Sequence, residues 1–305
     1  MQTLKIALDW TPNTNHTGFF VAQTEGYYQR KGLDVQIIHP AQDNYEVTPA
    51  KKLERDEVDL AITPTESILS YRFKENPAHF IAIAALLQSD TSAIVTLANS
   101  GIERPAQLDG KTYASYQARY EDAIVQQMVR NDGGTGDLKI SYPNKLGIWN
   151  TLLEEQADAT WIFRAWEGQE AQQRGVLLNY FLLENYGIPY GYSPVLITKQ
   201  ERITAEKETL QNFLAATREG FRLAIDNPEK AAAILTPSVP ERDRMHINIT
   251  ESQRFINDFY TRLGQWGRME KEVWQRFLDW LHQYHLIETK VEPEKLFTNA
   301  LLTDE

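Results

Sequence analysis

The chain has 305 residues, of which 42% are hydrophobic and 24% charged, and these values are typical of a folded protein with about two domains. Its net charge of −11 argues against nucleic acid as a partner, because phosphate binding depends on clustered lysine and arginine. The absence of cysteine excludes disulfides, zinc–thiolate sites and cysteine nucleophiles.

The N-terminal part of the chain predicts a β-α-β-α-β series with short connections. Strands are expected at residues 4–8, 33–38 and 58–62, and helices at 19–30, 48–56 and up to Tyr71. Gly32 stands just past the first helix, where glycine commonly ends a helix. This order is typical of a parallel sheet flanked by helices.

A second series of the same kind follows a turn-rich connector at 101–111. Its strands are expected at residues 112–115, 138–142 and 159–163, and its helices at 121–130 and 146–156. Two further strands are expected before the connector, at residues 80–87 and 93–97, and one more at 195–198. The part after it is mostly helical, with helices expected at residues 208–227, 228–235, 251–263 and 272–283. Two successive α/β units indicate an α/β protein with two lobes.

A polar loop follows the first strand and is the most informative part of the chain. Trp10, Asn13, Asn15 and His16 stand at the carboxyl end of that strand, where open α/β sheets usually bind ligands. Trp10 offers a flat apolar face and an N–H donor, and the asparagine amides can pair with ring nitrogens and amines. The alternatives are core packing for Trp10, turn formation for the asparagines and helix capping for His16.

Five segments resemble the periplasmic-binding-protein superfamily, in its NMT1/THI5-like branch of thiamine-precursor binding proteins and pyrimidine synthases. They are LDWTPNTNHTGFFVAQTEGYYQRKGLDV at 8–35, VDLAITPTES at 58–67, LDGKTYASYQARYEDA at 108–123, DATWIFRAWEGQEA at 158–171 and FLAATREGFRLAIDNPEKAAAIL at 213–235. The first segment is the most specific of the five. Together they extend the resemblance over nearly the whole chain.

The resemblance implies the two-lobed periplasmic-binding-protein fold of type II, with a hinge and a central ligand cleft. Lobe one is expected at residues 1–95 plus 194–305, and lobe two at 96–193. The implied partners are a small pyrimidine and the permease of an ABC transporter, and the protein is expected to act as a monomer. The implied location is periplasmic or anchored to the cell envelope, after removal of a signal that the given chain lacks; a cytoplasmic location is the alternative.

The resemblance also separates binding from catalysis. In the fungal-type synthase, pyridoxal phosphate is held by a lysine, and a histidine four residues later is consumed. In this chain Thr63 and Ser67 occupy those positions, and the cysteine-rich motif of the synthase is absent. Because a Schiff base needs a primary amine, we expect no catalytic residue and no cofactor. The expected ligand is a thiamine-related aminopyrimidine, N-formyl-4-amino-5-aminomethyl-2-methylpyrimidine or a similar compound.

The remaining ligand candidates follow other strands or the second crossing between the lobes. Glu66 and Glu121 can accept hydrogen bonds from an aminopyrimidine. The alternative for Glu66 is helix capping, with Thr63 and Glu66 at capping-box spacing, and the alternative for Glu121 is a first-turn position that the helix dipole favours. Tyr190 is the expected stacking partner opposite Trp10. The whole second group is Glu66, Tyr116, Glu121, Trp166, Glu167 and Tyr190.

Two alternative functions remain open at this point, and neither involves a metal site. The six histidines are scattered, so no metal site is expected. An enzyme of pyrimidine synthesis that uses a lysine at another position is the first alternative function. A binding protein of the same fold for a flavin or an alkanesulfonate is the second.

Overall fold

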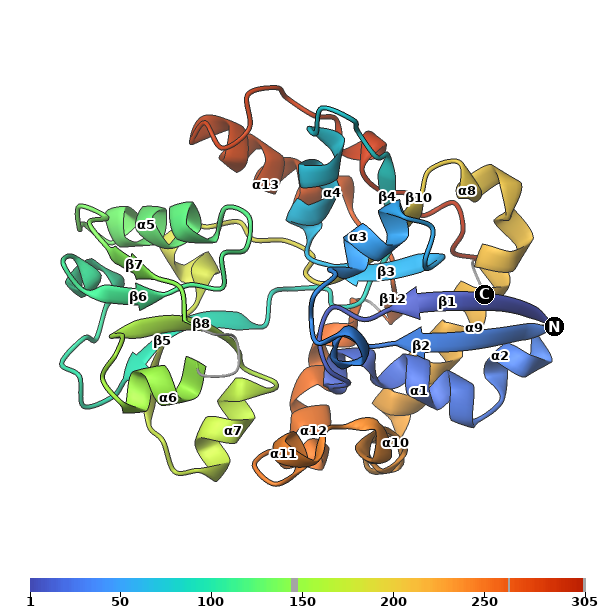
Figure 1. Ribbon diagram of the computed structural model, residues 1–305, viewed down its shortest axis with the longest axis horizontal. Helices are drawn as coiled ribbons and strands as arrows, with labels where there is room; N and C mark the ends of the chain where they lie inside the picture. The colour runs from blue at the N-terminus through green and yellow to red at the C-terminus, as the bar shows by residue number, and fades with distance from the viewer. Residues whose placement is uncertain (144–147, 263, 304–305) are drawn as a thin grey trace. The chain divides into compact units, whose positions relative to one another are not determined.

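The computed structural model describes residues 1–143, 148–262 and 264–303, and the chain forms two compact units. Unit 1 comprises Met1–Asp90, Gly191–Gln275 and Val291–Glu305, and unit 2 comprises Thr91–Tyr190 and Arg276–Lys290. Figure 1 shows that each unit has its own sheet with helices packed against it. The α/β periplasmic-binding-protein architecture expected from the sequence is confirmed. The lobe boundaries at 95/96 and 193/194 remain a proposal.

The sheet of unit 1 has the strand order β2-β1-β3-β10-β4. The strands are β1 (Gln2–Ala7), β2 (Leu33–Ile38), β3 (Leu60–Thr63), β4 (Phe80–Ala85) and β10 (Val195–Lys199). β1 pairs in parallel with β2 and β3, whereas β10 is antiparallel to β3 and β4. The carboxyl ends of β2, β1 and β3 therefore lie side by side at one edge of the sheet.

Helices cover both faces of this sheet, and the other helices of unit 1 follow the last strand. Figure 1 shows α1 (Thr17–Thr24), α2 (Tyr27–Arg30) and α9 (Lys207–Asp226) on one side, and α3 (Pro49–Glu54) and α4 (Thr65–Arg72) on the other. The remaining elements are α8 (Arg202–Ala205), α10 (Pro228–Leu235), α11 (Glu241–Arg244), α12 (Ile249–Tyr260), the hairpin β11 (Thr261–Arg262) with β12 (Gln265–Trp266), and the start of α13 (Lys271–Gln283).

Short 3-10 helices complete the described elements of both units. They are η1 (Thr14–His16), η2 (Pro40–Asp43), η3 (Pro105–Leu108), η5 (Leu183–Tyr186), η6 (Thr236–Ser238) and η7 (Pro293–Lys295). Two of them, η1 and η2, stand just after β1 and β2. They therefore shape the loops at the carboxyl edge of the unit 1 sheet.

Two glycines let α1 and α9 pack closely. A Cβ atom on Gly220 would lie 2.0 Å from the carbonyl oxygen of Gly18, and one on Gly18 would lie 2.1 Å from the ring of Phe221. Phe221 itself is fully buried, with its ring edge-on to Phe19 at 5.6 Å. The start of α1, which directly follows the loop after β1, is thus fixed against α9.

The sheet of unit 2 repeats this plan, with the order β7-β6-β8-β5-β9. Its strands are β5 (Ser92–Leu97), β6 (Thr112–Ala114), β7 (Lys139–Ser141), β8 (Ala159–Phe163) and β9 (Leu178–Phe181). β6 is parallel to β7 and β8, and β5 is antiparallel to β8 and β9. The described core beneath the sheet includes Ala93, Val95, Ala114, Leu152, Ala157 and Ile162.

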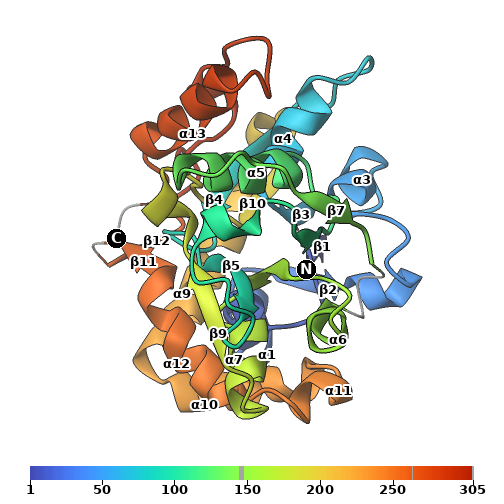
Figure 2. The same ribbon diagram turned by 90° about the vertical axis from the view of Figure 1, so that its left-hand side faces the viewer.

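The strand order of unit 2 determines on which face of the sheet its helices lie. The chain runs outward from β6 to β7 and back to β8, so right-handed crossovers place α5 (Glu121–Asn131) and α6 (Ile148–Leu153) on opposite faces. Figure 2 shows this arrangement. The third helix, α7 (Glu167–Gln173), follows β8 directly.

The structure corrects several expected elements. The helix expected at 19–30 is two helices, because Gly26 between them has a φ of +73°. Strand β9 was not expected from the sequence, and it pairs with β5 through only four residues. The expected helix at 146–156 begins outside the described residues. The helix expected at 251–263 ends at Tyr260, because Thr261 and Arg262 form strand β11, and its last expected residue lies outside the described residues. Gly32 has a φ of +74°, as its position past the helix predicts.

Candidate functional site

The loop after β1 is built by the Asn13 side chain. Its carbonyl oxygen accepts from the Asn15 backbone N–H at 2.9 Å, and its amide nitrogen donates to the Thr11 carbonyl at 3.1 Å. Asn13 is 6% exposed and caps the 3-10 helix that precedes α1. Both polar atoms of this side chain are therefore engaged within the loop, while Asn15 is partly exposed beside it. Ligand contact by either residue stays a prediction.

His16 holds a carboxylate at the same loop. Its Nδ1 accepts the Asn13 backbone N–H at 3.3 Å, so the proton is on Nε2, which donates to Asp9 Oδ1 at 2.7 Å. The imidazole is fully buried, whereas the Asp9 side chain is 24% exposed. The buried histidine thus orients a carboxylate that reaches solvent. Asp9 is a residue that the sequence analysis missed, although it stands next to Trp10.

Distant residues of α12 fix the backbone of this loop. The Thr14 and Ser252 hydroxyls lie 2.8 Å apart, and the Thr17 hydroxyl donates to Gln253 Oε1 at 2.6 Å. The Tyr260 hydroxyl donates to the Thr14 carbonyl and accepts from Gln253 Nε2 at 3.1 Å. All five side chains are buried at 1% exposure or less. Buried, mutually satisfied polar groups of this kind specify one loop geometry.

Trp10 has an aromatic neighbour in the loop after β2. The rings of Trp10 and Tyr45 have centroids 5.3 Å apart and planes tilted by 51°. Both residues are partly exposed, and burial raises the pKa of the Tyr45 hydroxyl. Asn44 and Tyr45 have φ values of 52° and 63°, a conformation that is unfavourable for side chains other than glycine and that recurs at binding sites. Tyr45 is a second candidate that the sequence analysis missed.

The same loop carries two buried polar atoms that need partners. His39 Nδ1 and Asp43 Oδ1 have no hydrogen-bond partner among the described residues. Desolvation and the positive charge of Lys52 lower the pKa of His39, so its imidazole is neutral near pH 7. The other Asp43 oxygen lies 2.6 Å from Nζ of Lys52, a side chain that is 9% exposed. Unsatisfied buried polar groups beside an aromatic pair are typical of a place where a ligand binds.

The loop after β3 differs from the sequence prediction. Pro64 is the residue that caps α4, and the Thr63 hydroxyl donates to the Pro64 carbonyl at 3.1 Å, so the capping-box interpretation of Thr63 and Glu66 is wrong. The Thr65 hydroxyl donates to the Tyr192 carbonyl. Glu66 is 4% exposed in the first turn of α4. Because β2, β1 and β3 are neighbours, Glu66 shares its sheet edge with Asp9 and Trp10.

Glu121 organises the matching loop of unit 2. Its Oε1 accepts from the Tyr113 hydroxyl at 2.8 Å and from the Tyr116 N–H at 3.1 Å. Its Oε2 accepts from the N–H groups of Tyr116 at 3.1 Å and Ala118 at 3.0 Å. Burial raises the pKa of Glu121, although these hydrogen bonds act to lower it. Burial and the negative charges of Glu167 and Glu121 raise the pKa of the Tyr116 hydroxyl. Ligand contact by Tyr116 and Glu121 stays a prediction.

The other unit 2 candidates lie around β8 and the end of the unit. Glu167 accepts the Phe163 N–H at 3.0 Å, and Trp166 is 6% exposed at the start of α7. Tyr190 packs edge-on against Trp161 and Phe277, each at 5.5 Å between ring centroids. These contacts give Tyr190 a packing role within unit 2, and its stacking opposite Trp10 remains a prediction.

Two classes of feature are absent from the part of the chain that the structure describes. No group of three or more histidine, aspartate and glutamate side chains there is arranged to hold a metal ion. No helix there has both the length and the apolar character needed to cross a membrane.

Known proteins resemble the chain in sequence and in fold. The model of the family described as NMT1/THI5 like matches residues 13–231. A formylaminopyrimidine-binding protein of Halalkalibacterium halodurans is 25% identical, with 98% of this chain and 90% of that protein covered. A 4-amino-5-hydroxymethyl-2-methylpyrimidine phosphate synthase of Saccharomyces cerevisiae, THI13, is 32% identical, with 76% of this chain and 70% of the synthase covered. The ligand-binding component of an ABC-type import system from Staphylococcus aureus has the same fold, with a TM-score of 0.73, 11% identity and coverage of 99% and 98%.

Proposed function

We propose a function from the premise that the chain belongs to the NMT1/THI5-like family. The protein binds a small aminopyrimidine of the thiamine-precursor type, N-formyl-4-amino-5-aminomethyl-2-methylpyrimidine or a close analogue, and releases it unchanged. Binding takes place at the carboxyl edge of the unit 1 sheet. The formylaminopyrimidine-binding relative, which matches this chain over 98% of its length, supports this choice.

The observation that carries the proposal is the set of groups at that edge. Trp10 and Tyr45 provide partly exposed aromatic faces, which suit a flat heterocycle. The Asp9 carboxylate accepts hydrogen bonds from an exocyclic amine, and His39 and Asp43 supply the unsatisfied polar atoms. An aminopyrimidine offers two apolar faces with donors and acceptors around its rim, so it matches all of these groups.

Binding without chemistry is supported by the two residues on which a Schiff base would depend. Thr63, at the position of the synthase lysine, has no amine. Lys52 is the buried lysine in this region, and its ammonium is ion-paired with Asp43 at 2.6 Å. This ion pair already engages the Lys52 nitrogen. Treatment with pyridoxal phosphate and borohydride is expected to leave Lys52 unmodified; a covalent adduct on Lys52 in the mass spectrum supports the enzyme alternative.

In this proposal the protein acts as a monomer on the outer side of the cell membrane and delivers its ligand to the membrane permease of an ABC importer. The fold shared with an import component from Staphylococcus aureus is compatible with this role. Deletion of the gene is expected to abolish uptake of the labelled pyrimidine by intact cells. Unchanged uptake contradicts the transport role and leaves binding itself to be judged separately.

Ligand identity is tested by thermal shift and calorimetry with four compounds: the formylaminopyrimidine, its hydroxymethyl analogue, riboflavin and an alkanesulfonate. The formylaminopyrimidine is expected to give the largest rise in melting temperature, because ligand binding to the folded state stabilises it. Trp10→Ala is expected to reduce the affinity at least about tenfold through loss of the stacking face. Tyr27→Ala, a partly exposed aromatic residue elsewhere in unit 1, is the control and leaves the affinity unchanged. A larger shift with riboflavin or the sulfonate overturns the assignment.

A further inference from the structure

The loop after β2 leaves the sheet beside the loop after β1. The Leu8 N–H donates to the Ile38 carbonyl at 2.8 Å, which continues the parallel pairing of β1 with β2. The next residue, His39, therefore lies across from Leu8, at the usual distance of about 4.8 Å between neighbouring strands. Further along, the Tyr45 N–H returns to the Pro40 carbonyl at 2.9 Å. The loop is thus compact and stands next to the residues that follow Leu8.

Two polar atoms of this loop lack a partner. His39 Nδ1 and Asp43 Oδ1 are buried and make no hydrogen bond among the residues that the structure describes. Both side chains nevertheless reach solvent, because that of Asp43 is 27% exposed and His39 is partly exposed. Leaving such atoms unsatisfied is costly, so a ligand that bonds to both is favoured. Two residues after Asp43, the ring of Tyr45 contacts Trp10, which places the atoms in the loop that carries one of the proposed stacking faces.

The charges around these atoms favour a polar but uncharged ligand group. The other Asp43 oxygen lies 2.6 Å from Lys52 Nζ, so the carboxylate and the ammonium compensate each other. Burial and the charge of Lys52 lower the pKa of His39, which keeps the imidazole neutral near pH 7. A neutral imidazole can carry its proton on Nδ1 and donate it. The loop thus offers one acceptor and one donor without net charge, next to a lysine that repels cations.

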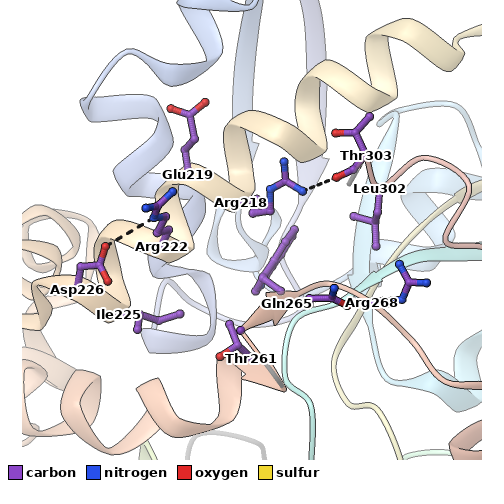
Figure 3. A pocket seen from close by; sticks show the side chains of 12 residues that line it. Arg218, Glu219, Arg222, Ile225, Asp226, Thr261, Gln265, Arg268, Leu302 and Thr303 are labelled. Atoms are coloured by element: carbon purple, nitrogen blue, oxygen red, sulfur yellow. Dashed lines mark hydrogen bonds and ion pairs between the residues drawn. The ribbon is translucent and has the colours of Figure 1, made fainter. Parts of the chain in front are cut away.

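A cavity elsewhere in unit 1 does not offer this combination. It has a volume of about 510 Å³ and lies between α9, the β11–β12 hairpin and the chain near Thr303 (Figure 3). None of its described lining residues belongs to the loop after β1 or to the loop after β2. Its aromatic lining residue, Trp266, is 4% exposed and stacks on Phe221, so it has no open face for a heterocycle. The cavity is therefore not an alternative place for the pyrimidine.

We propose that His39 and Asp43 determine specificity by binding the formamide arm of the pyrimidine. The Asp43 carboxylate accepts the formamide N–H, and His39 Nδ1 donates to the formyl oxygen. This inference rests on the proposed function and names the part of the ligand that the loop after β2 selects. The Asp9 carboxylate remains available for the ring amine. The deformylated compound ends in an ammonium group, which has no acceptor for the His39 proton and is repelled by Lys52.

Calorimetry with the whole protein tests the proposal through two dissociation constants, one for the formylaminopyrimidine and one for its deformylated aminomethyl counterpart. The wild type is expected to bind the formyl compound at least about tenfold more tightly. His39→Leu is expected to weaken binding of the formyl compound roughly tenfold and to leave the other constant unchanged, because only the formyl oxygen loses its donor. His39→Asn keeps a side-chain N–H close to the position of Nδ1, and it is expected to restore most of the preference.

His79→Leu is the matched control. His79 is exposed and directly precedes β4. Because β3 and β4 are both antiparallel to β10, they run in the same direction, and His79 lies at the opposite edge of the sheet. This variant is expected to leave both dissociation constants unchanged.

The outcomes separate this inference from the function on which it rests. If neither compound binds to the wild type, the proposed pyrimidine function is overturned and the inference falls with it. If the formyl compound binds but the wild type shows no preference for it, or if His39→Leu keeps the preference, the function stands and the role of His39 and Asp43 is overturned.

Discussion

The two units share one sheet plan but hold their first loops in different ways. In unit 1, the loop between β1 and α1 is bonded to Ser252, Gln253 and Tyr260 of α12, more than 230 residues away in the chain. In unit 2, the loop between β6 and α5 is held by Glu121, the first residue of the helix that follows. The same strand order is therefore compatible with a loop that is held by distant residues and with one that is held by the helix directly after it.

The difference bears on function because the unit 1 loop presents the groups proposed for the ligand. Asp9 and Trp10 stay partly exposed, while the polar atoms that shape their loop are buried and satisfied. In unit 2 the carboxylate of Glu121 both shapes the loop and is 3% exposed. Unit 1 thus separates the residues that build the loop from those that face solvent, and this separation allows each role to be tested alone.

The largest effect is expected where α1 meets α9. Gly220→Ala places a Cβ atom 2.0 Å from the Gly18 carbonyl oxygen, so the helices must move apart, at a cost of about 3 kcal/mol. Gly168→Ala is the matched change in unit 2, where the nearest atom would lie at 3.5 Å. There the loss of glycine flexibility in α7 is expected to stabilise by roughly 0.5 kcal/mol. Urea denaturation of both variants measures these changes, and equal effects contradict the close packing of α1 on α9.

Tyr260→Phe is expected to give the next largest effect. It removes the hydroxyl between the Thr14 carbonyl and Gln253, and a buried hydrogen-bond network loses about 2 kcal/mol when one member is deleted. Pyrimidine affinity is expected to fall as well, because the loop that carries Trp10 loses an anchor. Tyr142→Phe is the control in unit 2. The Tyr142 side chain is exposed, and its hydroxyl donates to the Asp122 carboxylate. The free energy of unfolding is expected to change by no more than about 0.5 kcal/mol. If Tyr260→Phe leaves both the melting temperature and the pyrimidine affinity unaltered, α12 does not anchor the loop after β1 as described.

Glu121→Gln tests whether Glu121 holds the loop between β6 and α5. The free energy of unfolding at neutral pH is expected to fall by about 1 kcal/mol, since an amide nitrogen replaces one acceptor oxygen.

The contribution of Glu121 to stability is also expected to depend on pH. Burial raises the pKa of Glu121 above its usual value of 4.5, so the folded state binds this proton more tightly than the unfolded state does. The stabilisation of the folded state by this proton on Glu121 is complete below pH 4.5 and is lost as the pH rises through the raised pKa. The stability advantage of the wild type over the variant therefore shrinks from acid to neutral pH, and an advantage that grows contradicts the assignment.

The sequence predicts those features that depend on local patterns. Alternating or continuous apolar runs located the strands of both units that begin near Leu4, Leu33, Phe80 and Ala159, and the apolar spacing of α9 located its buried face. Thr48, expected at the start of a helix, does cap α3 by accepting the Lys51 N–H at 3.3 Å. Each of these signals lies within a few residues of the structure it determines.

Features that depend on distant contacts were missed for the opposite reason. Strand β9 exists because β5 offers it an edge, and its own sequence, Leu-Asn-Tyr-Phe, is too short to stand out. Tyr45 and His39 follow β2, and only the pairing of β2 with β1 brings their loop to the same sheet edge as Trp10. The anchoring of Thr14 by α12 likewise has no local signal. Strand order, which periodicity does not reveal, is the missing information in each case.

The most direct test of the account is the dissociation constant for the formylaminopyrimidine in the wild type, Asp9→Asn and Asp34→Asn, measured by calorimetry. Asp9→Asn keeps an acceptor oxygen for His16 but removes the exposed negative charge at the proposed site. Asp34→Asn removes the same charge from an exposed position of β2. The account predicts that the dissociation constant rises roughly tenfold or more for Asp9→Asn, as expected for a lost charged hydrogen bond, and stays unchanged for Asp34→Asn. Equal dissociation constants in all three proteins contradict the placement of the pyrimidine at the edge of the unit 1 sheet.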